Sequence, residues 1–376
     1  MIFEFPPGAD YQLRSLEKVV SGLYPKHKLE CIHGFSKSYT PGGFHLHRLL
    51  NLAWLYCLVP LKLIFRRPSW LLVRSAPPGI QVWVGLWAGL LGIPSIAWLM
   101  DYHPEIEARI LDRKVFLRPL AWFLRIVDRF SLQFHRAAVV LDESMAAQLR
   151  SACKELPIIV HPTWDSYRNG EERSVGERSD KPLKLAYGGN LGLRHSASSL
   201  GELIARVVDR SAHPFVELHV IGSSSNGIRK FEGLASQYPL HLHCYPRMGF
   251  EDLLSTLRKI DADYGVVLMN DLDQGLYSPS KYAGYLAAGI PVLYMGPEQT
   301  NAYKICQDFG AGIHLSMYAG KARIEDVAGS LCDLQNRREH RFAVASAKEH
   351  FAAYNAETFF AAISTFLPSE WGDSSF

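Results

Sequence analysis

The sequence lacks the cysteine spacing that holds a zinc ion or a redox-active disulfide. Its six cysteines are scattered over 376 residues without a Cys-x-x-Cys pair, which favours a reducing compartment. The 15 histidines do not fill this gap. His45 and His47 stand close together, but no further ligand lies near them in the sequence. We therefore read both as surface or capping residues, and we predict no metal site and no cofactor.

A signal peptide and a long apolar run are also absent. No basic segment followed by an apolar core opens the chain, so we expect no export and a cytoplasmic location. The most apolar run, 49–65, covers about 17 residues, whereas a membrane-spanning helix usually needs about 20. Pro60 and Lys62 interrupt this run. We predict a buried or half-buried helix here rather than a span.

The chain has little excess of charge of either sign. Its formal net charge of +3 is too small to indicate a nucleic-acid partner, and we predict none. Apolar residues make up 48% and charged residues 20% of the chain, which is typical of a globular protein. A length of 376 residues allows two domains that each bury a core.

Residues 1–165 are predicted to form the first domain, a Rossmann-like α/β fold. The domain opens with an apolar segment, a loop containing Gly8, and a helical pattern of apolar residues. Short apolar runs then alternate with helical segments, which is typical of a parallel sheet covered on both faces. The predicted strands are 29–32, 70–74, 95–99 and 138–141.

A polar and charged linker is predicted at 166–182, where there is almost nothing to bury. A second Rossmann-like domain follows at 183–349 with the same alternation. Its predicted strands are 183–187, 216–221, 240–244, 264–268, 292–295 and 312–315. Two such domains form a cleft at the carboxyl ends of their sheets, where ligands bind in open α/β folds.

The segment 277–293 places a hydroxyl, a lysine and a helix start next to one another. Pro279 and Ser280 suit the first turn of a helix, because proline needs no partner there and serine can cap free amides. Lys281 then lies in that first turn, where its charge opposes the helix dipole unless an anion binds between them. Gly289 ends the helix. The pattern favours a diphosphate site, and an ordinary solvated lysine is the alternative.

This segment resembles the Pro-Ser-Lys-x-x-Glu-Tyr-x-Ala-x-Gly-x-Pro-Val pattern of nucleotide-sugar glycosyltransferases with the GT-B fold. The resemblance is to the family-four group, which builds bacterial surface polysaccharides, and it covers most of the second domain and, more loosely, residues 75–105. It implies two Rossmann-like domains facing each other across a cleft, with the C-terminal helix, about 350–376, packed back on the first. The donor diphosphate is expected to contact Lys281, with Ser280 and Gly8 also in the donor site.

Gly284 departs from this pattern. Many of the resembled enzymes carry a glutamate here that hydrogen-bonds the nucleotide ribose, and glycine has no side-chain acceptor. Either another residue or the backbone holds the ribose, or the site is degraded. Both alternatives stay open at this stage.

A second phosphate-suited turn follows the first predicted strand of the second domain. Its glycines let the backbone approach a ligand, and a helix starting near Ser196 presents free amides. The turn resembles the Gly-Asn-Leu-Gly turn of the same family, and a tight turn with a surface arginine is the alternative. The donor-site candidates here are Gly189, Asn190, Gly192 and Arg194.

Two further loops follow strands of this domain. Gly222 opens a polar loop that we expect at the rim of the site. Arg247 and Met248 follow the next strand, in a loop that lies against the nucleotide base in the resembled enzymes. A plain loop before a helix is the alternative for that second segment.

The densest acid/base cluster of the first domain is Asp101, His103 and Glu105, directly after a predicted strand. A carboxylate here can accept the proton of an acceptor hydroxyl, and His103 can bind the donor sugar. The resembled family often has Asp-x-x-Pro at this place, which this chain matches from Asp101 to Pro104. The alternative is that Asp101 caps the following helix and Glu105 suits its first turn.

Basic and apolar residues alternate between Arg109 and Arg136. Such helices can lie on an anionic membrane surface, and an enzyme that extends a lipid-linked glycan works at the bilayer. The inner face of the membrane is therefore a second expected location. A domain helix with an apolar core face and a solvated arginine face gives the same pattern.

The sequence thus predicts a glycosyltransferase that moves a sugar from a nucleotide-diphosphate donor to a hydroxyl of a glycan or lipid-linked acceptor. Positive charge and amide donors can stabilise the leaving group without a metal, and the resemblance favours retention of the anomeric configuration. Two alternatives remain: another sugar-nucleotide enzyme such as an epimerase, and an inactive GT-B homologue that acts as a binding subunit.

Overall fold

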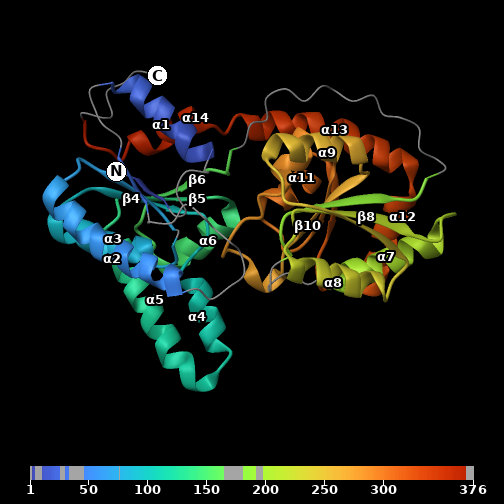
Figure 1. Ribbon diagram of the computed structural model, residues 1–376, viewed down its shortest axis with the longest axis horizontal. Coiled ribbons are helices and arrows are strands. Elements are labelled where there is room, and N and C mark those ends of the chain that lie inside the picture. The colour runs from blue at the N-terminus through green and yellow to red at the C-terminus, as the bar shows by residue number, and fades with distance from the viewer. Residues whose placement is uncertain are drawn as a thin grey trace. The chain divides into compact units, whose positions relative to one another are not determined.

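The computed structural model describes residues 2–4, 11–25, 30–33, 46–75, 77–164, 181–191 and 198–369. The chain forms two compact units. Unit 1 comprises Met1–Thr163, Gly275–Ser278 and Tyr354–Phe376, and unit 2 comprises Trp164–Gln274 and Pro279–Ala353. Each unit is an α/β domain built on one parallel sheet, as predicted (Figure 1).

Unit 1 contains a six-stranded parallel sheet in the order β2-β1-β3-β4-β5-β6. Strands β3, β4 and β5 are short apolar runs whose side chains are buried on both faces, which is the pattern of a parallel sheet covered by helices. The strands are β1 (Ile2–Glu4), β2 (Cys31–His33), β3 (Leu71–Arg74), β4 (Ser95–Leu99), β5 (Ala137–Val140) and β6 (Ile158–Val160).

Helices cover both faces of this sheet. One face packs on apolar side chains of α2 and α3, and Trp98 on the opposite face contacts Phe359 of α14, with ring centroids 4.7 Å apart. Helix α14 also packs beside α1. The helices of unit 1 are α1 (Tyr11–Leu23), α2 (Leu46–Arg66), α3 (Ile80–Leu91), α4 (Glu105–Asp112), the 3-10 helix η1 (Val115–Leu117), α5 (Arg118–Leu132), α6 (Glu143–Ala152) and α14 (Ala356–Ser364).

The apolar run at 49–65 lies in α2, which confirms the predicted helix. Leu55, Val59 and Leu63 follow one another at helical spacing and are buried against α3 and β3, whereas Leu61 and Phe65 are exposed. Among the described residues, we find no helix with the length and apolarity needed to cross a membrane.

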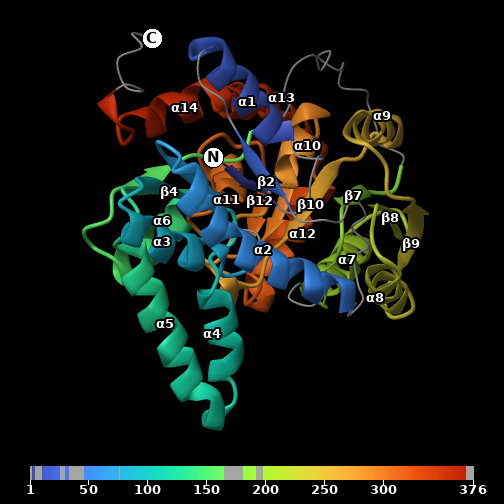
Figure 2. The ribbon, with the colours of Figure 1, turned by 60° about the vertical axis from the view of Figure 1, so that its left-hand side comes forward.

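Helices α4 and α5 form a hairpin that extends away from the sheet of unit 1 (Figures 1 and 2). The 3-10 helix η1 lies at its tip. The two helices pack side by side.

Unit 2 contains a second six-stranded parallel sheet, in the order β12-β11-β10-β7-β8-β9. Its strands are β7 (Lys184–Gly188), β8 (Val216–Ile221), β9 (Leu240–Tyr245), β10 (Tyr264–Leu268), β11 (Val292–Met295) and β12 (Gly312–Leu315). Five of the six strands are buried along most of their length, but β9, at the edge, has only Leu240 buried, and its other side chains are half-buried or exposed.

The core of unit 2 lies between the sheet and three helices, α7, α8 and α12, with Phe231, Leu203 and Leu331 among its buried side chains. The remaining helices lie on the opposite face (Figures 1 and 2). The helices of unit 2 are α7 (Ser198–Arg210), α8 (Ser225–Ala235), α9 (Phe250–Ile260), the 3-10 helix η2 (Asp271–Asp273), α10 (Tyr282–Ala287), α11 (Asn301–Gln307), α12 (Lys321–Cys332) and α13 (Leu334–Ala352).

The strand predictions match the structure to within two residues at each described end, and β6 was not predicted. The C-terminal helix predicted at about 350–376 begins later, because α13 ends at Ala352 and Asn355 starts a new helix with a capping box to Thr358. Most of the predicted linker lies outside the described residues.

Candidate functional site

Two glycine turns lie side by side where β7 and β8 end. Gly189 has φ 91° and Gly222 has φ 73°, a region that favours glycine. The Gly189 amide donates to the carbonyl oxygen of Ile221 at 2.7 Å. A Cβ atom on Gly189 would lie 3.4 Å from Cε of Lys281. The first turn and the lysine, which are far apart in the sequence, therefore meet at this edge of the sheet.

Lys281 lies over the turn that follows β7. Its Nζ donates to the hydroxyl of Tyr187 at 2.5 Å and to the carbonyl oxygen of Asn190 at 3.5 Å. The same Nζ stands 4.0 Å from the centroid of the Tyr187 ring, which is a cation–π contact. Within the described part of the chain, no carboxylate forms an ion pair with Lys281.

The charge of Lys281 is therefore only partly compensated. Burial lowers the pKa of Lys281 to about 7, because desolvation disfavours the ammonium form. A bound anion would raise this pKa again and so keep Lys281 in its charged ammonium form. Burial, a lowered pKa and the lack of a carboxylate partner among the described residues are together typical of a lysine in an anion-binding site.

Tyr285 connects α10 to the sheet below this turn. Its hydroxyl accepts from the amide of Gly188 at 2.7 Å and donates to the carbonyl oxygen of Val266 at 3.1 Å. Its ring lies against Gly265, where a Cβ atom would be only 2.2 Å from the ring. Tyr285 thereby holds the start of α10 in register with the end of β7, and it was not among the predicted site residues.

Asn190 joins the two glycine turns. Its Oδ1 accepts from the amide of Ser224 at 3.2 Å and from the hydroxyl of Ser224 at 2.7 Å. Ser224 in turn caps α8 by accepting from the amide of Gly227. The side-chain oxygen of Asn190 is therefore used to position the turns.

The start of α10 differs from the prediction in one respect. The helix begins at Tyr282, so Lys281 is its N-cap residue instead of a first-turn residue, and no side-chain hydrogen bond caps this end. Ser280 is exposed beside it and does not cap. Since α10 has only six residues, its dipole is short, and the ammonium group of Lys281 is the main attraction for an anion.

Gly284 lies in the first turn of α10, and its surroundings are open. A Cβ atom there would meet only Leu253 Cδ2, at 3.9 Å. Packing therefore does not require glycine at this position. A Cβ atom therefore fits here, although Gly284 itself is buried.

The remaining predicted donor-site residues fall into three groups. Arg247 is exposed and close to the second glycine turn, because a Cβ atom added to Gly222 would lie 3.5 Å from Cα of Arg247. Met248 is half-buried against α9, where its sulfur accepts from the hydroxyl of Thr256 at 3.3 Å. The candidates Gly8, Gly192 and Arg194 lie outside the described residues.

In unit 1, the loop after β4 holds Asp101 and His103. Asp101 is exposed, and its amide donates to the hydroxyl of Ser75 at 3.2 Å. The backbone of Asp101 forms a bridge with Tyr277, and the amide of Tyr102 donates to the carbonyl oxygen of Leu276 at 2.6 Å. The peptide bond from His103 to Pro104 is cis.

His103 pairs with Glu107, which sequence reasoning missed. Nδ1 of His103 lies 2.6 Å from Oε1 of Glu107. Gln81 of α3 donates to the carbonyl oxygen of His103, so the backbone of His103 is held as well as its imidazole. The spacing of four residues, from the turn before α4 to its first turn, was the available signal.

Glu105 does not join this group. Its carboxylate accepts from Arg125 at 2.8 and 3.1 Å and from Arg109 at 3.3 Å. Only 11% of the Glu105 side chain is exposed. Glu105 therefore joins α4 to α5 through ion pairs, and the structure gives it a role in the hairpin.

No protein-family model and no curated protein sequence matches the chain. Solved structures do. Staphylococcus aureus TarM, in a complex with UDP, matches with a TM-score of 0.58 and 11% identity over 84% of this chain and 59% of that one. The chain thus spans about three fifths of the length of TarM.

Two further structures match along nearly their whole length. Sucrose-phosphate synthase from Thermosynechococcus elongatus has a TM-score of 0.65 and 13% identity, over 95% of both chains. WaaG, a glycosyltransferase involved in lipopolysaccharide biosynthesis, has a TM-score of 0.57 and 15% identity, over 96% of this chain and 97% of that one. These neighbours are GT-B glycosyltransferases. The chain therefore has the GT-B fold of nucleotide-sugar glycosyltransferases.

Proposed function

We propose that this protein is a glycosyltransferase that uses a nucleotide-diphosphate sugar. The observation that carries the proposal is Lys281, a lysine with no carboxylate partner among the described residues, held over the Gly189 turn with a pKa lowered to about 7. The turn supplies backbone that a phosphate can approach closely. Bacterial surface polysaccharide or glycolipid assembly is the process this activity would serve.

In the reaction, the acceptor hydroxyl attacks the anomeric carbon, the bond to the diphosphate oxygen breaks, and the nucleotide diphosphate leaves. Lys281 stabilises the negative charge that develops on the leaving group. Asp101 or His103 accepts the proton of the acceptor hydroxyl, and Glu107 holds the imidazole of His103. We propose that the chemical step itself needs no metal ion, so transfer should proceed without added Mg²⁺ or Mn²⁺.

Mass spectrometry tests the reaction class. The full chain is incubated with UDP-, GDP- and dTDP-sugars, with and without a glycan or glycolipid acceptor extract. A transferase releases the nucleotide diphosphate and adds one sugar to the acceptor. An epimerase changes the free nucleotide sugar without any acceptor. Consumption that does not depend on acceptor would therefore contradict the proposal.

We also propose that the α4–α5 hairpin contacts an anionic membrane. The alternative of an apolar core face does not account for its side chains, because many large apolar ones are exposed, with Phe116 at 78% and Trp122 at 65%. Exposed basic residues lie among them. The other exposed apolar residues are Ile110, Val115, Leu120, Phe123, Ile126 and Phe130, and the exposed basic ones are Arg113, Lys114, Arg118 and Arg129.

Not every arginine of this segment is available to lipid. Arg125 donates to Glu105 and to Asp112 at 2.6 Å, and Arg109 also pairs with Glu105. The lipid-facing charge is therefore concentrated near the tip of the hairpin, where it stands beside apolar side chains. This combination is that of interfacial helices.

Vesicle sedimentation tests the hairpin. The variant K114E/R118E should lose most of its binding to vesicles that contain phosphatidylglycerol, since each basic residue near the surface contributes about 1 kcal/mol. The variant K259E/K321E changes charge equally at exposed positions of unit 2 and should bind like wild type. Equal binding by both variants would contradict the membrane contact.

A further inference from the structure

Strands β8 and β9 place a glutamate and two histidines close together on one face of the sheet of unit 2. Glu217 and His219 belong to β8 and lie two residues apart, so both point to the same face. His243 of β9 is directly opposite His219 in the parallel register. The apolar residues between them, such as Leu218, point to the core. Three potential metal ligands thus converge on a face that is open at the sheet edge.

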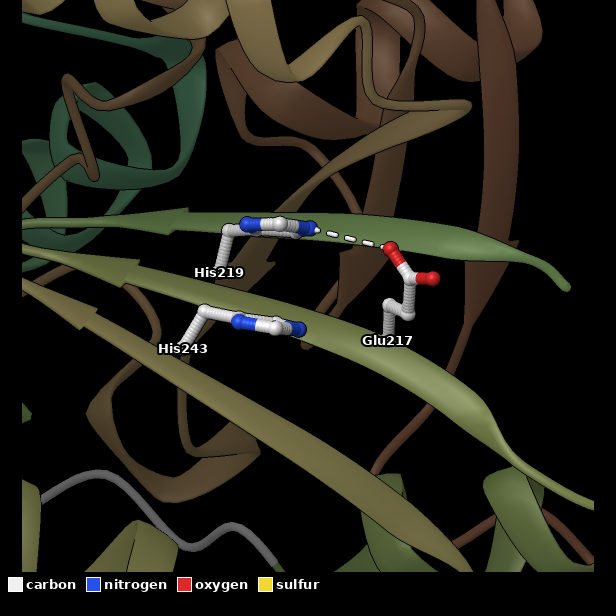
Figure 3. A group of neighbouring side chains, drawn as sticks. All are labelled: Glu217, His219 and His243. Atoms are coloured by element: carbon white, nitrogen blue, oxygen red, sulfur yellow. Dashed lines mark ion pairs between the residues drawn. The ribbon is translucent and has the colours of Figure 1, made fainter.

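The geometry of these side chains is close to that of a metal site (Figure 3). The rings of His219 and His243 are stacked with centroids 4.6 Å apart and an interplanar angle of 12°. Nε2 of His219 lies 3.4 Å from Oε2 of Glu217. One ligand atom from each residue lies within 4.8 Å of the others. In Figure 3 both rings extend toward Glu217.

These distances suit a tetrahedral zinc ion. Zinc binds histidine nitrogen and carboxylate oxygen at about 2.0–2.2 Å, so neighbouring ligand atoms of a tetrahedral site lie about 3.4 Å apart. Glu217 and His219 already have this separation. The two stacked rings must rotate apart for both nitrogens to point at one ion. His243 can make this movement, because its side chain is exposed.

The surroundings of both ring nitrogens of His219 suit a metal ligand. Nδ1 lies 3.0 Å from the hydroxyl oxygen of Tyr245, which orients the ring as outer partners of metal-bound histidines do. Nε2 is buried, and apart from its 3.4 Å contact with Oε2 of Glu217 it finds no hydrogen-bond partner among the described residues.

Glu217 supplies a negative charge that attracts a cation to this cluster. Lys184 lies 3.4 Å from Oε2 of Glu217 and is the one charged group that competes with a cation here, among the described neighbours. Lys184 and His219 both contact the same oxygen, Oε2, so an ion bound to Oε2 leaves Oε1 as the acceptor for Lys184.

We propose that Glu217, His219 and His243 bind one Zn²⁺ ion, with water as the fourth ligand. The ion joins β8 to the edge strand β9. Gly222 and Arg247 follow the ends of these two strands, so the ion also fixes the spacing of two loops. The proposal does not depend on the glycosyltransferase activity, since metal binding is measured without substrate.

Calorimetric titration of EDTA-treated, dialysed full-length protein with ZnCl₂ tests this site. Wild type should bind one Zn²⁺ and gain thermal stability, because the folded state binds the ion preferentially. H243A and E217Q should each lose this binding and this gain. Y245F should retain the site with about 10-fold weaker affinity, as expected for an outer partner.

H241A is the matched control. His241 is the neighbouring exposed histidine on the same face of β9, but its ring stacks on Phe215 with centroids 3.7 Å apart, so H241A should bind Zn²⁺ like wild type. Melting curves without metal check that each variant folds. The proposal is overturned if wild type binds no Zn²⁺, or if it binds no more tightly than folded H243A. Equal losses in H241A and H243A overturn it too.

Discussion

Lys281 is the residue on which the proposed function depends most. Its ammonium group contacts an aromatic ring, a hydroxyl and a carbonyl, all of them uncharged. Such partners hold a lysine in place without neutralising it. A diphosphate supplies the missing negative charge, which is why we place this residue at the centre of the account.

Replacing Lys281 with alanine should weaken UDP binding by about 10-fold to 100-fold, the effect expected for loss of a charge-assisted contact of about 1.5–3 kcal/mol. Calorimetry measures the change. K259A removes an exposed lysine of α9 and should leave the affinity unaltered. UDP affinity in K281A equal to that of wild type would show that the lysine is an ordinary one.

The same lysine predicts a pH dependence of binding. With a pKa of about 7, Lys281 of the protein without ligand loses its proton above neutral pH. Diphosphate binding must then be coupled to uptake of a proton by Lys281. The dissociation constant for UDP should therefore rise with pH between 7.5 and 8.5, by up to about 10-fold per pH unit. The slope should be absent in K281A. A flat profile for wild type contradicts the assigned titration.

Individual site residues differed in how far the sequence predicted them. Lys281 and Gly189 carry local signals, because a lysine at a helix start and a glycine after a strand are visible in the chain. The contact between Lys281 and Tyr187 was not predictable, since it joins residues 94 positions apart. Glu107 was missed because the predicted acid/base cluster ended at Glu105.

The α4–α5 hairpin is an element held by ion pairs. Glu105 pairs with Arg125 across the two helices and with Arg109 within α4. E105Q should lower the free energy of unfolding by about 1–3 kcal/mol, because it leaves charged donors with a weaker partner. Urea denaturation measures this effect.

Sugar transfer separates the two roles of Glu105. If the residue only holds the hairpin, transfer by folded E105Q should stay within about 10-fold of wild type, whereas loss of a general base costs about 10²–10⁴-fold. A loss of that larger size in a variant of normal stability would return Glu105 to the catalytic group.

Helix α5 also carries a buried carboxyl group. The hydroxyl of Tyr102 donates to Asp128 at 3.0 Å, and burial raises the pKa of Asp128 to about 7, above its ordinary value of about 3.9. Between these values the folded protein holds a proton that the unfolded chain has released. The associated stability is complete below about pH 4 and is lost as the pH rises to about 7.

D128N keeps a neutral side chain and should remove this loss. Its free energy of unfolding, relative to wild type, should increase by about 2–3 kcal/mol between pH 5 and pH 8. Urea denaturation at several pH values gives this difference, in which the contributions of other groups such as buried His135 cancel. A difference that stays constant with pH would show that Asp128 is ionised throughout.

Elements were the best-predicted level of this molecule. Strands such as β8 and β11 are short apolar runs between turn residues, and their bounds match the predictions. Helix α10 starts later than predicted: it begins at Tyr282, so Pro279 and Ser280 lie before the helix and not in its first turn. The exposure of Phe116 and Trp122 was not predictable, because a helical pattern alone does not say whether its apolar face meets a core.

For the whole molecule, the alternation of strands and helices was sufficient to predict two α/β domains with parallel sheets. The cluster of Glu217, His219 and His243 was not predicted, because it depends on which residues of β8 and β9 stand opposite each other. Register between strands 24 residues apart is set by the folded sheet.

The central claim is that this GT-B chain binds a nucleotide-diphosphate sugar. Calorimetric titration of the full-length protein with a panel of UDP-, GDP- and dTDP-sugars tests it most directly. The account predicts that at least one of them binds with a stoichiometry of one and that K281A weakens this binding. Absence of binding by every member of the panel would contradict it.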